Sequence, residues 1–239
     1  MKHAVVSRDE WLAARTEHLR REKEFSKLRD QLSAERRALP WVRVDTTYTF
    51  DTPDGPRTLA DLFDGRSQLI VYHFMFGPGW EEGCRSCSLL SDHIDGATVH
   101  LAQRDVTLVA VSRAPLDRIE PFRKRMGWRF PWVSSHGSDF NHDHHVSFTE
   151  EDRAAGEVDY NFGRQRYMSD ELPGLSVFIR DESGDVFHTY SAYARGLDLL
   201  VGAYNYLDLA PKGRDEDALD FTMAWVRHHD RYATAPATA

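Results

Sequence analysis

The chain has two cysteines, Cys84 and Cys87, separated by only two residues. A disulfide between them would close a very short loop and add little chain-entropy stabilisation, so the pair does not serve as a staple for a large domain. Where a strand leads into a helix at the first cysteine, unpaired backbone amides and the helix dipole stabilise its thiolate. The second thiol lies one helical turn away, within disulfide reach. The pattern predicts a redox-active pair with Cys84 as nucleophile and Cys87 as resolving thiol.

The residues around the pair modify this chemistry. Arg85 favours the Cys84 thiolate, whereas Glu81 and Glu82 disfavour it. Trp80, just ahead of the cysteines, is predicted to form a wall of a substrate cleft. We therefore expect the substrate to bind beside Trp80.

Arg113 follows the second predicted strand and would stand at the same carboxyl edge of the sheet as Cys84. There it could bind an anionic group of the substrate. A salt bridge or a helix cap is the alternative role for this side chain.

Histidines gather in the long segment that runs from Ser134 to Pro173, and the candidate ligands there are His142, His144 and His145. Imidazoles two positions apart converge if the segment is extended, and one of them with two thiolates would suit Cu(I) or Zn. A copper- or zinc-binding protein is therefore the alternative function. The leading interpretation is a solvated polar loop and a protein without a cofactor.

Three further histidines are interpreted as structural. His73 lies inside an apolar strand and is expected to be a hydrogen-bonded core residue. His228 and His229 are expected on the exposed surface of a final helix, Leu219 to Tyr232.

Strand and helix patterns alternate along most of the chain. This alternation predicts an α/β fold with helices on both faces of a mainly parallel sheet, and a terminal hairpin that makes the sheet mixed. The segment from 134 to 173 interrupts the pattern as a long loop insertion, typical of a lid or binding loop, with a short helix near Glu150 to Ala155. The expected strands are 68–76, 106–111, 130–133, 175–179 and 186–190, and the expected helices are 88–101, 116–126 and 197–209.

Residues 1–40 are predicted to form an amphipathic helix. Ser7 and Glu10 fit a capping box, no Pro or Gly follows from Trp11 to Leu39, and apolar residues recur every seven positions. The helix either packs across its own domain or pairs with a second subunit in a homodimer. The sequence then predicts one α/β domain over 41–232 and a disordered tail over 233–239.

Composition narrows the partners and the compartment. The formal net charge of -8 leaves no basic excess for nucleic acid or an anionic membrane. The longest apolar run, Leu69 to Phe76, is too short to span a bilayer, and the charged N-terminal region lacks the apolar core of a secretory signal. We expect a cytoplasmic protein that binds neither nucleic acid nor membrane.

The stretch from Tyr72 to Ser88 resembles a bacterial thioredoxin-like family described as dithiol-disulfide isomerase-like proteins of unknown function. Further matching blocks are Ser138–Asn141, Pro173–Phe178 and Phe187–Gly196. The resemblance implies a thioredoxin-like fold related to peroxiredoxins, with Cys84 and Cys87 at the redox position. It implies no established substrate.

Two comparisons refine this resemblance. Thioredoxins have a cis-proline facing the cysteines, and Pro173 occupies a similar place, where it could present its neighbour's backbone to a substrate; an ordinary loop proline is the equal alternative. Peroxiredoxins use a Pro-x-x-x-Thr/Ser-x-x-Cys pattern. In this chain Glu81 is the residue three positions before Cys84, and Pro78 is six positions before it, so the peroxiredoxin pattern is not matched. The chain is therefore predicted to be a thiol–disulfide oxidoreductase that takes a protein or small-molecule disulfide and is regenerated by a dithiol electron donor.

Overall fold

The structure is a computed structural model that describes residues 3–233. The chain forms two units, which divide after Pro40. The first consists mainly of helix α1 (Arg8–Arg37). Its N-terminus carries the predicted capping box, in which the Ser7 amide donates to Glu10 at 2.9 Å and the Glu10 amide donates to the Ser7 hydroxyl at 3.3 Å. The helix ends before Pro40, which lacks the amide hydrogen that an α-helix requires.

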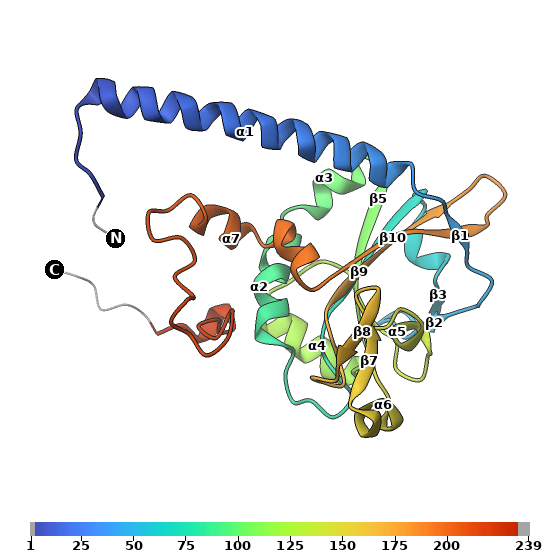
Figure 1. Cartoon of the computed structure of the whole chain (residues 1–239). Coiled ribbons are helices and arrows are strands. Elements are labelled where there is room, and N and C mark those ends of the chain that lie inside the picture. The colour runs from blue at the N-terminus through green and yellow to red at the C-terminus, as the bar shows by residue number, and fades with distance from the viewer. Residues whose placement is uncertain (1–2, 234–239) are drawn as a thin grey trace. The chain divides into compact units, whose positions relative to one another are not determined.

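A mixed six-stranded sheet forms the centre of the second unit (Figure 1). Strand β4 pairs in parallel with β5, which pairs in parallel with β6, while β9, β10 and β1 complete the sheet with antiparallel pairings. In order across the sheet the strands are β1 (Val42–Arg43), β10 (Val186–Tyr193), β9 (Gly174–Arg180), β4 (Gln68–His73), β5 (Val106–Ser112) and β6 (Trp132–Ser134).

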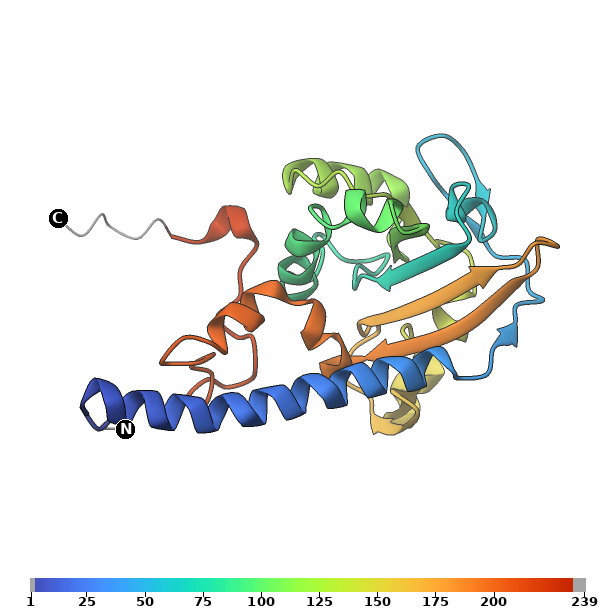
Figure 2. The same ribbon diagram turned by 90° about the horizontal axis from the view of Figure 1, so that it is seen from above.

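Both faces of this sheet are covered by apolar side chains. On one face Tyr72 and Phe74 belong to a core with helices α2 (Arg85–Ile94), α4 (Leu116–Arg125) and α7 (Gly202–Leu207). Figure 2 shows α2 and α4 together on one side of the sheet. On the other face Leu69 and Val71 pack with the short helix η1 (Asp61–Phe63), strand β2 (Thr49–Phe50) and Phe140 of α5 (Phe140–Asp143). Strand β2 pairs with β3 (Arg57–Thr58) in a small second sheet.

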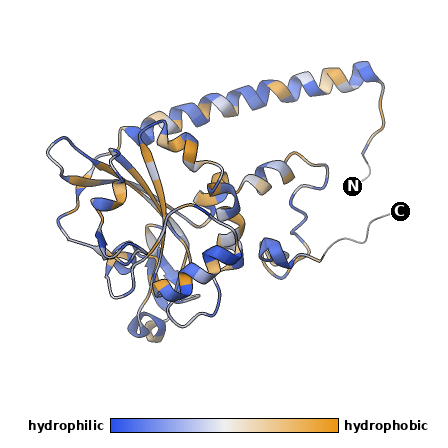
Figure 3. Ribbon diagram, turned by 180° about the vertical axis from the view of Figure 1, so that it is seen from behind, coloured by the Kyte–Doolittle hydropathy of each residue, from blue (hydrophilic) through white to orange (hydrophobic). Residues whose placement is uncertain are grey.

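The order of these elements is thioredoxin-like. Strand β4 leads into the helix that carries the two cysteines, the chain returns in the parallel strand β5, and the β9–β10 hairpin closes the other side of β4. The predicted α/β class, with a mixed central sheet flanked by helices, is therefore confirmed. In Figure 3 apolar colour follows the strands of the sheet, as expected for strands buried on both faces.

The predicted loop insertion contains ordered structure. After α5 come α6 (Glu150–Ala155), at the predicted position, and the hairpin β7 (Glu157–Tyr160) with β8 (Gly163–Arg166). The insertion has a small core of its own, formed by Val146, Phe148, Val158, Tyr160 and Leu172 with Tyr193 of β10.

Two predicted helices differ from the structure. The helix expected over 88–101 is divided into α2 and α3 (Thr98–Ala102). The prediction of a helix over Leu219–Tyr232 is wrong, because this segment forms turns and a short 3-10 helix, η3 (His229–Arg231). The Glu216 carboxylate accepts hydrogen bonds from the Met223 amide at 3.0 Å and the Trp225 indole at 2.6 Å, so side-chain contacts within the C-terminal segment take the place of helical hydrogen bonds.

The remaining C-terminal helix is also divided. The residues expected to form one helix over 197–209 lie in the 3-10 helix η2 (Ala194–Leu200) and in α7. Of the tail expected to be disordered over 233–239, residues 234–239 lie outside the described part of the chain. No helix within residues 3–233 is both long and apolar enough to cross a membrane.

Candidate active site

The cysteine pair lies at the start of α2. Cys84 is the N-cap residue, its amide donates to the Met75 carbonyl at 3.0 Å, and its own carbonyl accepts from the amide and hydroxyl of Ser88, each at 2.9 Å. The loop between β4 and α2 therefore folds back onto the end of the strand and holds Cys84 over the helix terminus. Both thiols are reduced; Cys84 is partly exposed and Cys87 is 3% exposed.

The surroundings of Cys84 favour its thiolate. The pKa of this thiol is lowered from 9.0 to about 6, chiefly by a hydrogen bond from the Cys87 side chain, then by the backbone amides of Cys87 and Ser86 and by the charge of Arg85. Partial burial opposes this effect and is outweighed. The predicted helix-terminus effect is thus present, but the partner thiol is the larger contributor.

Cys87 has the opposite character. Burial raises its pKa well above the usual value, and the hydrogen bond and charge of Cys84 raise it further. The Tyr72 hydroxyl, buried beneath it on β4, hydrogen-bonds to the Cys87 sulfur and acts in the other direction. The two thiols are therefore distinct at neutral pH, with one ionised at the surface and one protonated beneath it.

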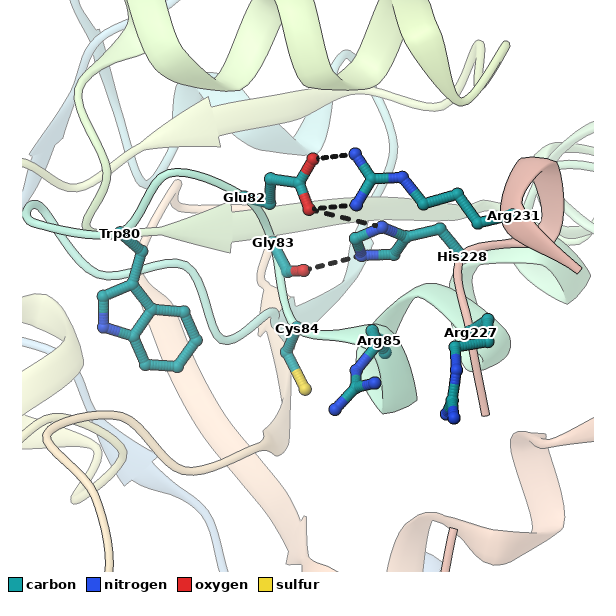
Figure 4. A pocket seen from close by; sticks show the side chains of 8 residues that line it. All are labelled: Trp80, Glu82, Gly83, Cys84, Arg85, Arg227, His228 and Arg231. Atoms are coloured by element: carbon teal, nitrogen blue, oxygen red, sulfur yellow. Dashed lines mark hydrogen bonds and ion pairs between the residues drawn. The ribbon is translucent and has the colours of Figure 1, made fainter. Parts of the chain in front are cut away.

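A cleft of about 470 Å³ opens at Cys84. Figure 4 shows the Cys84 sulfur between the Trp80 indole and the Arg85 side chain, so the predicted neighbour Trp80 does form part of the cleft. A Cβ atom on Gly77 would meet the Trp80 ring at 3.0 Å, which shows how closely the ring lies against the loop backbone. The lining residues are Trp80, Glu82, Gly83, Cys84, Arg85, Arg227, His228 and Arg231.

The C-terminal segment forms the wall opposite Trp80. The ring of His228 is 2% exposed, and its Nε2 donates to the Gly83 carbonyl at 2.9 Å. The prediction that His228 lies on an exposed helix surface is therefore wrong, because the turn-rich C-terminal segment folds onto the cysteine loop. Its neighbour His229 is exposed, as expected, and contacts Asp92 at 2.7 Å.

Ion pairs join the same two segments. Glu82, two residues before Cys84, accepts from Arg125 at 2.6 Å and from Arg231 at 2.8 Å. Burial raises the pKa of this carboxyl, but the hydrogen bond from Arg231 and the charges of Arg125 and Arg231 outweigh burial and lower it overall. Arg125 also binds both oxygens of Asp230. The backbone before Cys84 is thus held from α4 and from the C-terminal segment.

Arg113 follows β5 as predicted, but it does not line the cleft. Its Nε donates to Glu171 at 2.8 Å, and its Nη1 donates to His142 at 2.7 Å. Glu171 is 1% exposed, and its other oxygen accepts from Ser147 at 2.5 Å. The guanidinium is therefore occupied by an internal ion pair, which is the alternative that the sequence left open.

Pro173 also lies outside the cleft lining. No peptide bond in residues 3–233 is cis, so Pro173 differs here from the proline of thioredoxins. The amide of the preceding Leu172 donates to the Val146 carbonyl at 2.9 Å, and the Pro173 carbonyl accepts from the Tyr160 hydroxyl at 2.6 Å. Both of these backbone groups are therefore hydrogen-bonded within the insertion.

The three candidate metal ligands are separated. His142 binds Arg113, His145 is exposed, and the His144 ring packs 5.4 Å from His73 and 5.3 Å from His188, measured between ring centroids. Within residues 3–233 no group of three or more His, Cys, Asp or Glu side chains is placed to hold a metal ion. The predicted copper or zinc site is therefore not formed.

His144 instead joins a buried polar cluster on the face of the sheet opposite the cysteines. His73 contacts the Ser176 hydroxyl at 2.9 Å, His188 contacts Ser191 at 2.8 Å, and the two serines contact each other at 3.0 Å. Burial is the main cause that lowers the pKa of each of the three imidazoles, that of His144 to about 3. The expectation that His73 is a hydrogen-bonded core residue is confirmed.

Sequence reasoning missed Tyr72 and the C-terminal arginines. The period of a strand could have identified Tyr72, because it shares a face with Phe74 beneath α2. No local pattern indicates that Arg227, His228 and Arg231 return to a loop about 145 positions earlier. Their proximity is a result of tertiary folding alone.

Comparisons place the chain among known sequences and folds. Over residues 1–232 it matches the family described as "Bacterial protein of unknown function (DUF899)". No curated protein matches it.

Solved structures with similar folds include redox proteins. The peroxidoxin BcpB of Mycobacterium tuberculosis is 12% identical with a TM-score of 0.41, over 69% of this chain and 94% of that one. The bacterioferritin comigratory protein of Xanthomonas campestris is 12% identical with a TM-score of 0.44, over 69% of this chain and 94% of that one. A proposed protein disulfide isomerase of Bacteroides thetaiotaomicron is 18% identical with a TM-score of 0.37, over 70% of this chain and 91% of that one. These low identities and TM-scores assign no activity to this chain.

Proposed function

The chain belongs to the bacterial family DUF899, and we propose from its cysteine site that it is a thiol–disulfide oxidoreductase. The observation that carries the proposal is the unequal pair at the start of α2. Cys84 has a pKa lowered to about 6 and opens into a cleft, while the buried Cys87 is in hydrogen-bonding contact with it. A nucleophilic thiol needs an accessible thiolate, and a resolving thiol needs proximity.

The reaction follows from these two roles. The Cys84 thiolate attacks one sulfur of a disulfide RS–SR, which forms a mixed disulfide and releases RS⁻, and this group takes a proton from water. Cys87 then loses its proton and attacks the Cys84 sulfur. The internal disulfide forms, and the second RS⁻ leaves and is protonated. The substrate gains the two electrons that the cysteine pair loses.

The protein groups favour each step. The amides of Ser86 and Cys87 stabilise the attacking thiolate of Cys84. Once Cys84 is in a mixed disulfide, the negative charge that raised the pKa of Cys87 is gone, while the hydrogen bond from Tyr72 remains to stabilise its thiolate. An external dithiol then reduces the internal disulfide and regenerates the pair. In this proposal the substrate is a disulfide and the partner is a dithiol donor.

The test is a single turnover of the reduced protein with the neutral hydroxyethyl disulfide. The wild-type chain should lose both thiols, and Cys84→Ser should react at least about 100-fold more slowly because the stabilised thiolate is gone. Cys87→Ser should stop at the mixed disulfide, which mass spectrometry detects as one added hydroxyethylthio group. The double variant contains no cysteine and supplies the background. A Cys84→Ser protein that retained the wild-type rate would refute the proposal.

A further inference from the structure

The cleft at Cys84 differs in charge from the protein as a whole. The chain has a formal net charge of -8, yet the cleft is lined by Arg85, Arg227 and Arg231 and by only one carboxylate, that of Glu82. Cleft walls of low dielectric strengthen the effect of such local charge. The local excess of positive charge therefore favours the binding of an anion in this cleft.

The single carboxylate is already neutralised. Glu82 accepts hydrogen bonds from both Arg125 and Arg231. Arg125 is in turn paired with Asp230. Glu82 is thus held by guanidinium groups away from the sulfur, as Figure 4 shows, and it does not cancel the charges of Arg85 and Arg227.

Within residues 3–233, Arg85 and Arg227 have no carboxylate partner. Arg85 is exposed and forms no ion pair with any carboxylate in the described residues. The Nη1 of Arg227 donates to the carbonyls of Ala224 and Val226, each at 2.9 Å, which orients the guanidinium but leaves its charge uncompensated. Both side chains stand on the same side of the Cys84 sulfur (Figure 4).

The opposite wall is aromatic. Trp80 presents its indole to the other side of the sulfur. The cleft volume of about 470 Å³ is in the range of small-molecule sites and is too small for a folded protein substrate to enter. A ligand that fits would place a short apolar chain against Trp80 and a negative group against the arginines.

We infer that the substrate is a small organic disulfide that carries a carboxylate near its sulfur atoms, bound by Arg85 and Arg227. The inference rests on the proposed thiol–disulfide exchange and identifies the substrate class of the same site. Guanidinium groups bind carboxylates with paired, charge-assisted hydrogen bonds. Binding in this way places a substrate sulfur beside the Cys84 thiolate, and the exchange proceeds by the electron-balanced steps given above.

The test compares three probes that differ in charge. Reduced full-length protein is mixed with dithiodiglycolate, hydroxyethyl disulfide or cystamine, which carry two carboxylates, no charge and two ammonium groups. Each rate of thiol loss is divided by the rate of the same probe with dithiothreitol, which removes differences in intrinsic reactivity. We expect the normalised rate to be at least about tenfold higher for the dianion than for the dication at low salt, and the ratio to fall at high salt.

Variants assign the preference to the two arginines. Arg85→Gln should reduce the dianion-to-dication ratio several-fold, and Arg85→Gln/Arg227→Gln should bring it close to one. The ratio is the readout because Arg85 also affects the Cys84 pKa, which changes all three rates together. Arg43→Gln, on the edge strand β1, removes one charge outside the cleft and should leave the ratio unchanged.

The outcomes are distinct. Equal normalised rates for all three probes would overturn the inference and leave the proposed function standing. A preference for the dianion that persists undiminished in the double variant would overturn the assignment to Arg85 and Arg227. Failure to reduce any probe, including the neutral one, would overturn the proposed function itself.

Discussion

His228 donates from Nε2 to the carbonyl oxygen of Gly83 at 2.9 Å, a contact that spans 145 positions of the sequence. Its Nδ1 accepts from Arg125 at 3.0 Å, so both ring nitrogens are used in a buried setting. The contact fixes the peptide unit directly before Cys84. The C-terminal segment is therefore structural support for the cysteine site as well as a wall of its cleft.

We expect His228→Ala to lower the free energy of unfolding by about 1–3 kcal/mol, because it leaves the Gly83 carbonyl without its buried donor and removes one acceptor of the Arg125 guanidinium. Urea denaturation of the reduced protein measures the change. His229→Ala is the matched control, since among residues 3–233 that exposed ring hydrogen-bonds to Asp92 alone and its loss should cost less than about 1 kcal/mol. Equal losses for the two variants would contradict the supporting role of His228.

The reaction of Cys84 with iodoacetamide should follow its lowered pKa. The rate should rise to half its maximum near pH 6, since the thiolate is the reactive form. Cys87→Ser removes the thiol that is the largest cause of the shift and replaces it with a hydroxyl of different length, so the midpoint should move upward. A midpoint near the ordinary value of 9.0 in the wild-type protein would contradict the description of the site.

The same shift links pH to stability. A thiol whose pKa is lowered by folding stabilises the native state above its unfolded pKa, and this contribution is lost as the pH falls toward 6. The reduced wild-type protein should therefore gain stability relative to Cys84→Ser between pH 6 and pH 9. Parallel urea titrations of the two proteins across this range measure the difference.

Much of the architecture was predictable, because apolar runs and caps are local signals. The strand that leads to Cys84, the parallel strand β5, the hairpin of β9 and β10 and the capping box at Ser7 all follow from patterns within a few residues. The position of Cys84 could be predicted for the same reason. The placement of Cys84 on a helix terminus depends only on the order of strand, loop and helix.

The predictions that failed concern segments whose side-chain contacts and turns no local pattern shows. The C-terminal segment has helix-compatible spacing, yet Glu216 and the cysteine loop supply hydrogen bonds that compete with helix formation there. The histidines 142, 144 and 145 are close in sequence but diverge, because His145 adopts a positive φ of 53° and the chain turns between the three rings. Spacing alone could not show this divergence.

Substitutions of Arg113 and Glu171, which form a buried ion pair, should have strongly coupled effects on the free energy of unfolding. Arg113→Ala leaves the Glu171 carboxylate buried without its counter-charge, and we expect a loss of about 3–5 kcal/mol in the free energy of unfolding at neutral pH. Adding Glu171→Gln should recover part of the loss, since the unpaired charge is then removed. A double-mutant cycle measured by urea denaturation gives the coupling.

The pH dependence of Arg113→Ala provides a second check. Burial already raises the pKa of Glu171, and loss of the arginine should raise it further. A carboxyl with a raised pKa in the folded state destabilises the protein as the pH rises, so the cost of Arg113→Ala should shrink on acidification toward pH 5. A cost that does not change with pH would show that Glu171 is not the charge involved.

The cluster of His73, His144 and His188 should make the fold sensitive to acid. Their pKa values are lowered in the folded state, so unfolding takes up protons below the ordinary value of 6.5 and stability falls as the pH is lowered toward 3. His144→Phe keeps a ring against Phe140 but cannot titrate. It should reduce the slope of stability against pH by up to about 1.4 kcal/mol per pH unit between pH 4 and 6. Urea denaturation of the variant and of the wild-type protein in parallel across this pH range measures the difference.

Gly83 should tolerate no larger side chain, because two rings lie against it. A Cβ atom there would meet Phe74 at 2.6 Å and Phe122 at 2.8 Å, and both rings are buried in the core beneath α2. Gly83→Ala must displace a ring or the loop backbone, and we expect a loss of about 1–3 kcal/mol in the free energy of unfolding.

The same substitution should change the reactivity of the Cys84 thiol, because Gly83 directly precedes Cys84. If the loop moves, the Cys84 sulfur shifts from the amides of Ser86 and Cys87, and the midpoint of its reaction with iodoacetamide should rise. Gly79→Ala is the matched control in the same loop, since a Cβ atom there meets nothing within 4 Å. If the two alanine variants behaved alike in stability and in thiol reactivity, close packing at Gly83 would not be what positions Cys84.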